Sequence, residues 1–251
     1  MKCISFSLFG SNPKYLIGAL KNVALANALL PDYKCYFFHD NSVPVYIIDQ
    51  LSIKSNTKVF NMSGSGIPPT MWRFLAIDFQ EVQLMLSRDT DSRLSQREIS
   101  VVREWEKDTT DFMIIKDHPG SHGTYAMFAG LWAMKKKANL TMRALIEDWI
   151  GLKTNEELNK RTADQVFLSE CILPLTANNM AYYDDFNINK ANNYRKIAYQ
   201  RENWRFIGEI FDENDIPEYH WKALRGHYWR SKGLLGYCFA KAYSLFVPEW
   251  R

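Results

Sequence analysis

Cysteine is scarce in this chain of 251 residues, and the spacing of the few cysteines excludes a common use of the residue. Cys3, Cys35, Cys171 and Cys238 form no Cys-x-x-Cys pair, which argues against a zinc ribbon. Cys3 and Cys35 lie in apolar runs of strand length, where free buried thiols behave as small hydrophobic side chains. We therefore expect reduced thiols and a cytoplasmic location.

Excess charge of one sign is also absent, as are long apolar runs. The chain has 31 lysines and arginines against 28 aspartates and glutamates, and this net charge of +3 argues against a nucleic-acid partner. No apolar run reaches the length of a membrane-spanning helix, and the first ten residues are too short and too lightly charged for a secretory signal. Internal repeats and low-complexity tracts are missing too. These absences favour a cytoplasmic globular protein.

Hydrophobic residues make up 47% of the chain, enough for one substantial α/β core. Apolar runs and turn signals predict strands at 3–9, 36–38, 58–60, 82–86 and 111–115, and helices at 15–30, 45–51, 70–79, 95–107, 127–136, 142–150 and 163–171. This alternation predicts a mostly parallel sheet with helices on both faces. We assign residues 1–210 to this domain and 211–251 to a C-terminal helical, aromatic extension packed on it.

The most informative segment spans residues 82–97 and reads VQLMLSRDTDSRLSQR. An apolar strand ends there in Asp89-Thr90-Asp91, at the sheet edge where ligands of such folds gather. Residues two apart in extended backbone point the same way and lie roughly 6–7 Å apart, so Asp89 and Asp91 can direct two carboxylates at one point. Such a pair suits a divalent cation that also takes phosphate oxygens, and Arg88 and Arg93 flank it. The alternative is a pair of solvated loop acids, because a bare Asp-x-Asp is common.

Several segments together resemble one known family. The runs MWRFLAIDF, LSRDTDSRLSQRE, the tryptophan of VREW and IIKDHPGSH are similar to bacterial and large-virus glycosyltransferases of the GT-A fold. The pattern continues with Gly130-Leu131-Trp132, which we expect on a helix, with Asp164-Gln165, and with Phe206-Ile207-Gly208. Lys116 and Ala133 depart from it, because an arginine and a second glycine are usual there. The resemblance spans roughly residues 1–208.

The resemblance implies a GT-A (Rossmann-like) fold and a nucleotide-diphosphate-sugar donor, a UDP-sugar first. It implies Mn²⁺ or Mg²⁺ held by Asp89 and Asp91, and a glycan, lipid-linked or protein acceptor. Donor contacts are expected from Leu8, Phe9, Gly10, Tyr15, Asp40, Arg73 and Arg88. Catalytic roles beside the sugar and acceptor are expected from Asp117, His118, Asp164 and Gln165.

Most of these residues also have a purely structural interpretation. Asp40 and Asp117 are typical turn residues, and Tyr15 is a typical core aromatic. Asp164 suits the first turn of a helix. His122, His220 and His227 are candidates for a third metal ligand, although lone histidines are more often structural. The aromatic, basic tail at 219–251 is either an amphipathic helix on a membrane surface or a final helix pair packed on the sheet.

Two other functions remain open from the sequence. A phosphotransferase of the haloacid dehalogenase type also uses Asp-x-Asp after a strand, but it carries the motif near its start and Thr or Val where this chain has Arg93. A non-catalytic nucleotide- or sugar-binding protein can share the fold, because a fold does not fix a function. The stereochemistry is open as well, since Asp117 and Asp164 are both candidates for a general base.

Overall fold

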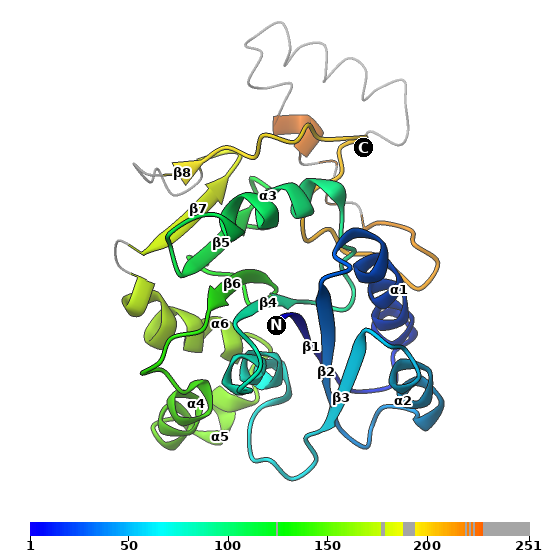
Figure 1. The fold of residues 1–251 in the computed structure, drawn as a ribbon, viewed down its shortest axis with the longest axis vertical. Helices are drawn as coiled ribbons and strands as arrows, with labels where there is room; N and C mark the ends of the chain where they lie inside the picture. The colour runs from blue at the N-terminus through cyan, green and yellow to red at the C-terminus, as the bar shows by residue number, and fades with distance from the viewer. Residues whose placement is uncertain are drawn as a thin grey trace, which may run out of the picture.

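The structure is a computed structural model that describes residues 1–123, 125–176, 179–187, 194–218, 220, 222 and 224–227. In these residues eight strands form one sheet in the order β3-β2-β1-β4-β6-β5-β7-β8 (Figure 1). Neighbouring strands run parallel except at β6, which is antiparallel to both β4 and β5. The strands are β1 (Lys2–Leu8), β2 (Tyr33–His39), β3 (Thr57–Asn61), β4 (Leu84–Arg88), β5 (Phe112–Lys116), β6 (Leu131–Lys135), β7 (Met180–Asp184) and β8 (Tyr194–Arg195).

Two hydrophobic clusters lie on the two faces of the sheet, because successive strand residues point to opposite sides. One cluster includes Phe6 and apolar side chains of α1 (Pro13–Leu29), α2 (Val45–Ser52) and α3 (Gln96–Glu106). The other includes Cys3 and side chains of η1 (Pro69–Asp78), α4 (Met142–Gly151) and α6 (Ala163–Phe167). Figure 1 shows α1 and α2 on one side of the molecule and α4 to α6 on the other. Three short elements complete the second layer: α5 (Asn155–Leu158), η2 (Leu168–Ile172) and η3 (Leu173–Thr176).

The predicted α/β fold is confirmed, and the helix-start signals act as expected. Pro13 occupies the first turn of α1, and the Asn12 side chain caps it by accepting a hydrogen bond from the Lys14 amide at 3.0 Å. Ser95 caps α3 in the same way, accepting from the Glu98 amide at 3.2 Å. These caps fix where two helices begin directly above the ends of β1 and β4.

The predicted helix over 127–136, with Gly130-Leu131-Trp132 on it, is wrong, because Leu131–Lys135 is the strand β6. Its residues lie between β4 and β5, and Trp132, Ala133 and Met134 are fully buried. A short apolar run that is buried on both faces shows no period that separates a strand from a helix. The pairing with two neighbours decides the outcome, and only the tertiary structure supplies it.

The far edge of the sheet, β7 and β8, was not predicted from the sequence. β7 pairs in parallel with β5, and β8 in parallel with β7. Residues 228–251 lie outside the described residues, and with them most of the predicted aromatic tail. Among the described helices, none combines the length and apolar character needed to cross a membrane.

Candidate functional site

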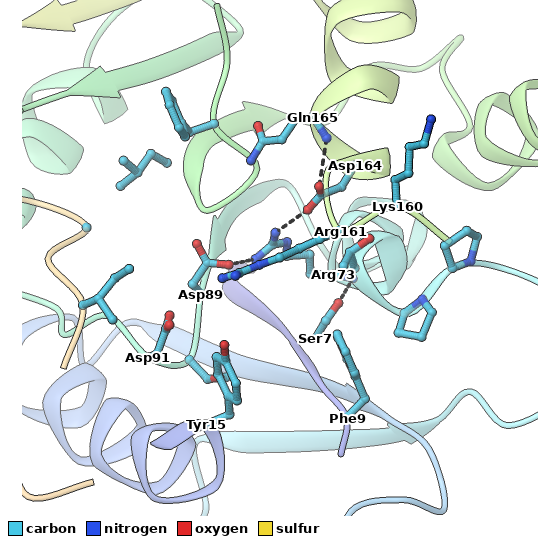
Figure 2. Close-up of a pocket in the computed structure, with 18 of the residues that line it drawn as sticks. Ser7, Phe9, Tyr15, Arg73, Asp89, Asp91, Lys160, Arg161, Asp164 and Gln165 are labelled. Atoms are coloured by element: carbon cyan, nitrogen blue, oxygen red, sulfur yellow. Dashed lines mark hydrogen bonds and ion pairs between the residues drawn. The ribbon is translucent and has the colours of Figure 1, made fainter. Parts of the chain in front are cut away.

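A cavity of about 930 Å³ opens at the sheet edge where β1 and β4 end. Figure 2 shows its lining, with Phe9 and Tyr15 at one end, Asp89 near the centre and Gln165 at the other end. Segments from across the chain contribute, since 66–70, 155–161 and 206–210 all supply lining residues. Seven of the residues predicted for donor binding or catalysis line the cavity: Phe9, Tyr15, Arg73, Asp89, Asp91, Asp164 and Gln165.

Asp89 and Asp91 leave the end of β4 and enter this cavity as predicted. The Asp89 side chain is 51% exposed, whereas that of Asp91 is 8% exposed and lies 3.3 Å from the Lys14 ammonium. Burial raises the pKa of Asp91 to about 6, and the charge of Asp89 adds to this rise. A buried carboxylate whose pKa is raised further by a neighbouring carboxylate is typical of a place that a cation can neutralise.

The Asp89–Asp91 loop is held by α1 and by the turn before β6. Asn22 is buried on α1, and its side-chain amide donates hydrogen bonds to Thr90 O at 3.1 Å and Ser92 O at 2.8 Å. Gly18, one turn earlier, packs so closely that a Cβ there would overlap the Thr90 carbonyl oxygen. Gly130 leaves room for the Asp89 side chain, because a Cβ at this position would overlap the carboxylate. Asn22, Gly18 and Gly130 therefore fix the position of the loop that carries the two carboxylates.

Arg73 joins the carboxylates of two separate segments. Its guanidinium pairs with Asp89 after β4 and with Asp164 on α6, the latter at 2.8 Å. β1 anchors the backbone of Arg73, since Ser7 Oγ accepts a hydrogen bond from its amide at 3.0 Å. Burial raises the pKa of Asp164, and the charge of Arg73 opposes that rise. Arg73 therefore links Asp164 to the Asp89–Asp91 loop.

The side chain of Gln165, at the far end of the cavity, is oriented by a backbone amide. Its Oε1 accepts a hydrogen bond from the Ala129 amide at 3.1 Å, so its Nε2 is the end left to donate. The backbone amide of Gln165 donates a hydrogen bond to Asp164 Oδ1 at 2.9 Å (Figure 2). Asp164 and Gln165 therefore lie together in the cavity lining, joined to each other by this bond and to the residues before β6 through Ala129.

His122 and His220 line the cavity, but His227 packs against Phe186 instead. His122 Nδ1 accepts a hydrogen bond from the Asp117 amide at 2.9 Å, so the neutral ring carries its proton on Nε2. Burial lowers the pKa of His122 to about 3, and the ring is neutral near pH 7. Across the described part of the chain, no three His, Cys, Asp or Glu side chains converge as a ready metal site. A cation held by Asp89 and Asp91 must therefore complete its coordination from a ligand or water.

Asp117 and His118, predicted to be catalytic, do not line the cavity. Asp117 is fully buried, with Arg97 at 2.8 Å and Arg201 at 2.6 Å, and it also accepts from the Ile207 amide at 2.9 Å. His118 Nδ1 accepts from the Gly120 and Ser121 amides, and its Nε2 donates to His220 O at 2.8 Å. Both residues hold backbone in place, which agrees with the structural interpretation of this turn.

Four residues predicted to bind the donor also lie outside the main cavity. Leu8 is buried in the core, and Arg88 is buried in a pair with Glu98. Gly10 adopts a φ of 76° and donates its amide to Ser42 Oγ at 2.6 Å. Asp40 accepts from the Ser42 amide at 3.0 Å in the turn that was its alternative interpretation. Asp40 faces a smaller cavity of about 340 Å³ that shares Gly66, Ile67 and Pro69 with the large one.

Two groups of site residues were missed by the sequence reasoning. The segment 155–161 contributes Asn155, Asn159, Lys160 and Arg161 to the cavity, and its signal was a polar, basic run just before Asp164-Gln165. Asn22 had a weaker signal, an asparagine at helical spacing from Gly18, Ala19 and Ala26. A buried polar residue in a helix needs a partner, and here the partner is the backbone of the loop after β4.

This arrangement, a mixed and mostly parallel sheet with the site at its carboxyl edge, is the GT-A fold of glycosyltransferases. No protein-family model and no curated protein matches the chain in sequence. Among solved structures, the glycosyltransferase GlyE of Streptococcus pneumoniae TIGR4 is similar with a TM-score of 0.50 and 16% identity, over 73% of this chain and 45% of GlyE. This chain thus spans less than half of GlyE, and at such identity the likeness is one of fold.

Two further structures have lower scores. The galactosyltransferase LgtC, solved with donor and acceptor sugar analogues, matches with a TM-score of 0.45 and 14% identity, over 72% of this chain and 73% of LgtC. Residues 1–349 of S. aureus TarS, solved with UDP, match with a TM-score of 0.42 and 18% identity, over 66% of this chain and 54% of that one.

Proposed function

We propose that this protein is a metal-dependent glycosyltransferase that moves a sugar from a nucleotide-diphosphate donor to a glycan, lipid-linked or protein acceptor. One observation carries the proposal: Asp89 and Asp91 enter a cavity of about 930 Å³ at the carboxyl edge of a GT-A sheet. GlyE, which shares this fold, is a glycosyltransferase by description. The resemblance of the sequence motifs to GT-A glycosyltransferases makes a UDP-sugar the first donor to test.

The residues present fit a hard divalent cation. Asp89 and Asp91 supply oxygen ligands, and a cation would offset both the burial and the repulsion from Asp89 that raise the pKa of Asp91. Mn²⁺ or Mg²⁺ bound there supplies positive charge to a diphosphate leaving group. Because two carboxylates are few ligands, the metal and the diphosphate bind best together. Phe9 and Tyr15 line the same end of the cavity and offer aromatic faces to a nucleobase.

The sugar is assigned to the space beside Asp164, Gln165 and His122. Asp164 accepts hydrogen bonds, Gln165 Nε2 donates them, and the neutral His122 ring has its proton on Nε2. Such a set of donors and acceptors distinguishes sugars by the orientation of their hydroxyl groups.

No carboxylate of the described cavity lining is free to act as a general base. Asp89 and Asp91 are assigned to the metal, and Asp164 is paired with Arg73 at 2.8 Å. Asp117 is enclosed by arginines away from the cavity. This favours transfer with retention of anomeric configuration, which requires no such base beside the acceptor.

Calorimetry with UDP, CDP, GDP and ADP tests the binding step, each titrated with and without Mn²⁺. We expect one nucleotide to bind at least tenfold more tightly with the metal, and to lose this gain when EDTA is added. Equal binding without metal would contradict the metal assignment. Release of free nucleotide from the matching nucleotide sugars then separates an enzyme from a non-catalytic binding protein, and the anomeric NMR signal of the product reports the stereochemistry.

A further inference from the structure

One cationic side chain in the cavity has no counter-ion. Arg161 lines the cavity from the turn between α5 and α6, and its side chain is exposed. In the part of the chain that the structure describes, it forms no ion pair or hydrogen bond. We propose that Arg161 binds the diphosphate of the donor from the side opposite Asp89 and Asp91. This inference rests on the proposed function and adds a binding residue to it.

The other lysines and arginines of this region have acidic neighbours. Arg73 lies between Asp89 and Asp164, and the Lys14 ammonium lies 3.3 Å from Asp91 and 2.8 Å from Glu218. Lys160 lies 3.9 Å from Glu156. Only Arg161, among the described basic side chains of the lining, has its full charge available to a ligand.

The backbone that carries Arg161 is fixed on both sides. A capping box between Thr154 and Glu157 opens α5, and the Ala163 amide donates to Lys160 O at 3.0 Å before α6. Figure 2 shows the Arg161 side chain extending across the cavity toward Asp89, whereas Lys160 points away from the two carboxylates. Arg161 therefore reaches the space above the proposed metal from the opposite wall.

The chemistry of transfer gives this charge a purpose. When the bond between the sugar carbon and the phosphate oxygen breaks, its electron pair stays on that oxygen and the nucleoside diphosphate gains one negative charge. The sugar carbon forms a new bond to the acceptor oxygen, whose proton passes to solvent. A cation held by Asp89 and Asp91 would supply positive charge to this diphosphate, and the guanidinium fork of Arg161 can donate two hydrogen bonds to its phosphate oxygens.

Inorganic pyrophosphate with Mn²⁺ tests this inference without a nucleobase or a sugar. We expect calorimetry to show binding to the wild type that Arg161→Ala weakens about tenfold or more, because a charge-assisted contact is lost. Arg161→Lys keeps the charge but loses the fork, and we expect an intermediate affinity. Arg143→Ala is the matched control, because Arg143 is exposed on α4, pairs only with Glu147 and lies outside the cavity. Circular dichroism confirms that each variant is folded.

Each outcome decides the question. If the wild type binds and Arg161→Ala binds equally well, Arg161 does not contact the diphosphate and the inference is overturned. If Arg143→Ala weakens binding as much as Arg161→Ala, the effect is one of overall charge, and the inference is again overturned. If wild-type protein binds neither Mn²⁺-pyrophosphate nor any Mn²⁺-nucleotide, the proposed function fails together with it.

Discussion

Asp91 holds a carboxylate where its surroundings disfavour the charge, and this is typical of residues kept for a function. The group is nearly buried, and Asp89 repels it further. We expect Asp91→Asn to abolish Mn²⁺-dependent nucleotide binding while leaving the free energy of unfolding unchanged or slightly higher, since a neutral amide is easier to bury. Asp49→Asn on the exposed face of α2 is the control. Retained metal-dependent binding in Asp91→Asn would falsify the metal assignment.

His122 is one side chain that makes the stability of the folded protein depend on pH. Its pKa in the folded protein is about 3, below the 6.5 expected of the unfolded chain. As pH falls below 6.5, the His122 ring binds a proton in the unfolded state but stays neutral in the folded state. The stability contributed by the neutral ring is therefore lost progressively between pH 6.5 and about 3, at up to about 1.4 kcal/mol per pH unit.

Replacing His122 isolates this effect from other groups. We expect urea denaturation of His122→Asn to show a weaker decline of stability below pH 6.5 than the wild type, since its side chain no longer titrates. His220→Asn serves as the control, because the His220 side chain is 43% exposed. Identical slopes for the wild type and His122→Asn would show that the ring protonates freely in the folded state.

At the scale of elements, the site depends on how closely α1 approaches the loop after β4. We expect Gly18→Ala to displace this loop, because the new methyl group would overlap Thr90 O, a backbone atom that cannot rotate away. Mn²⁺-dependent nucleotide affinity should fall at least tenfold, and stability by about 1–3 kcal/mol, as for other overpacked sites.

Gly151→Ala is the matched control for this packing effect. Gly151 ends α4, and a Cβ there meets no atom within 4 Å. The variant should bind metal and nucleotide as the wild type does. If Gly18→Ala also binds normally, α1 does not set the position of the Asp89 and Asp91 carboxylates.

At the scale of the whole molecule, Asp117 joins the end of β5 to α3 and to the segment that follows β8. It pairs with Arg97 of α3 and Arg201, and it accepts the Ile207 amide. We expect Asp117→Asn to lower the free energy of unfolding by about 3–5 kcal/mol, because two arginines lose a buried partner. Asp185→Asn, which removes a partly exposed partner of the same arginines, should be milder.

Denaturation and kinetics together distinguish this role from catalysis. Asp117→Asn protein that remains folded at low temperature should keep most of its turnover, since the side chain does not reach the cavity. A loss of turnover without a loss of stability would instead restore Asp117 to the reaction as its general base.

The amino-acid sequence alone predicts the α/β class, the strands β1 to β5 and the position of Asp89 and Asp91 at a strand end. These follow from local patterns: apolar runs, capping residues and the abrupt change to charge. It also indicated Arg73, Asp164 and Gln165, through the resemblance to GT-A glycosyltransferases. All three line the cavity.

Which residues share that cavity depends on contacts between distant segments of the folded chain. β6 is a strand because β4 and β5 flank it, and a five-residue buried run carries no period that reveals this. Asp117 and Arg88 look like site residues in the sequence, yet long-range partners draw them inward. Arg161 belongs to no motif that the sequence analysis identified, but the turn between α5 and α6 brings it opposite Asp89. Burial and partnership arise from contacts between distant segments, so they are properties of the folded chain.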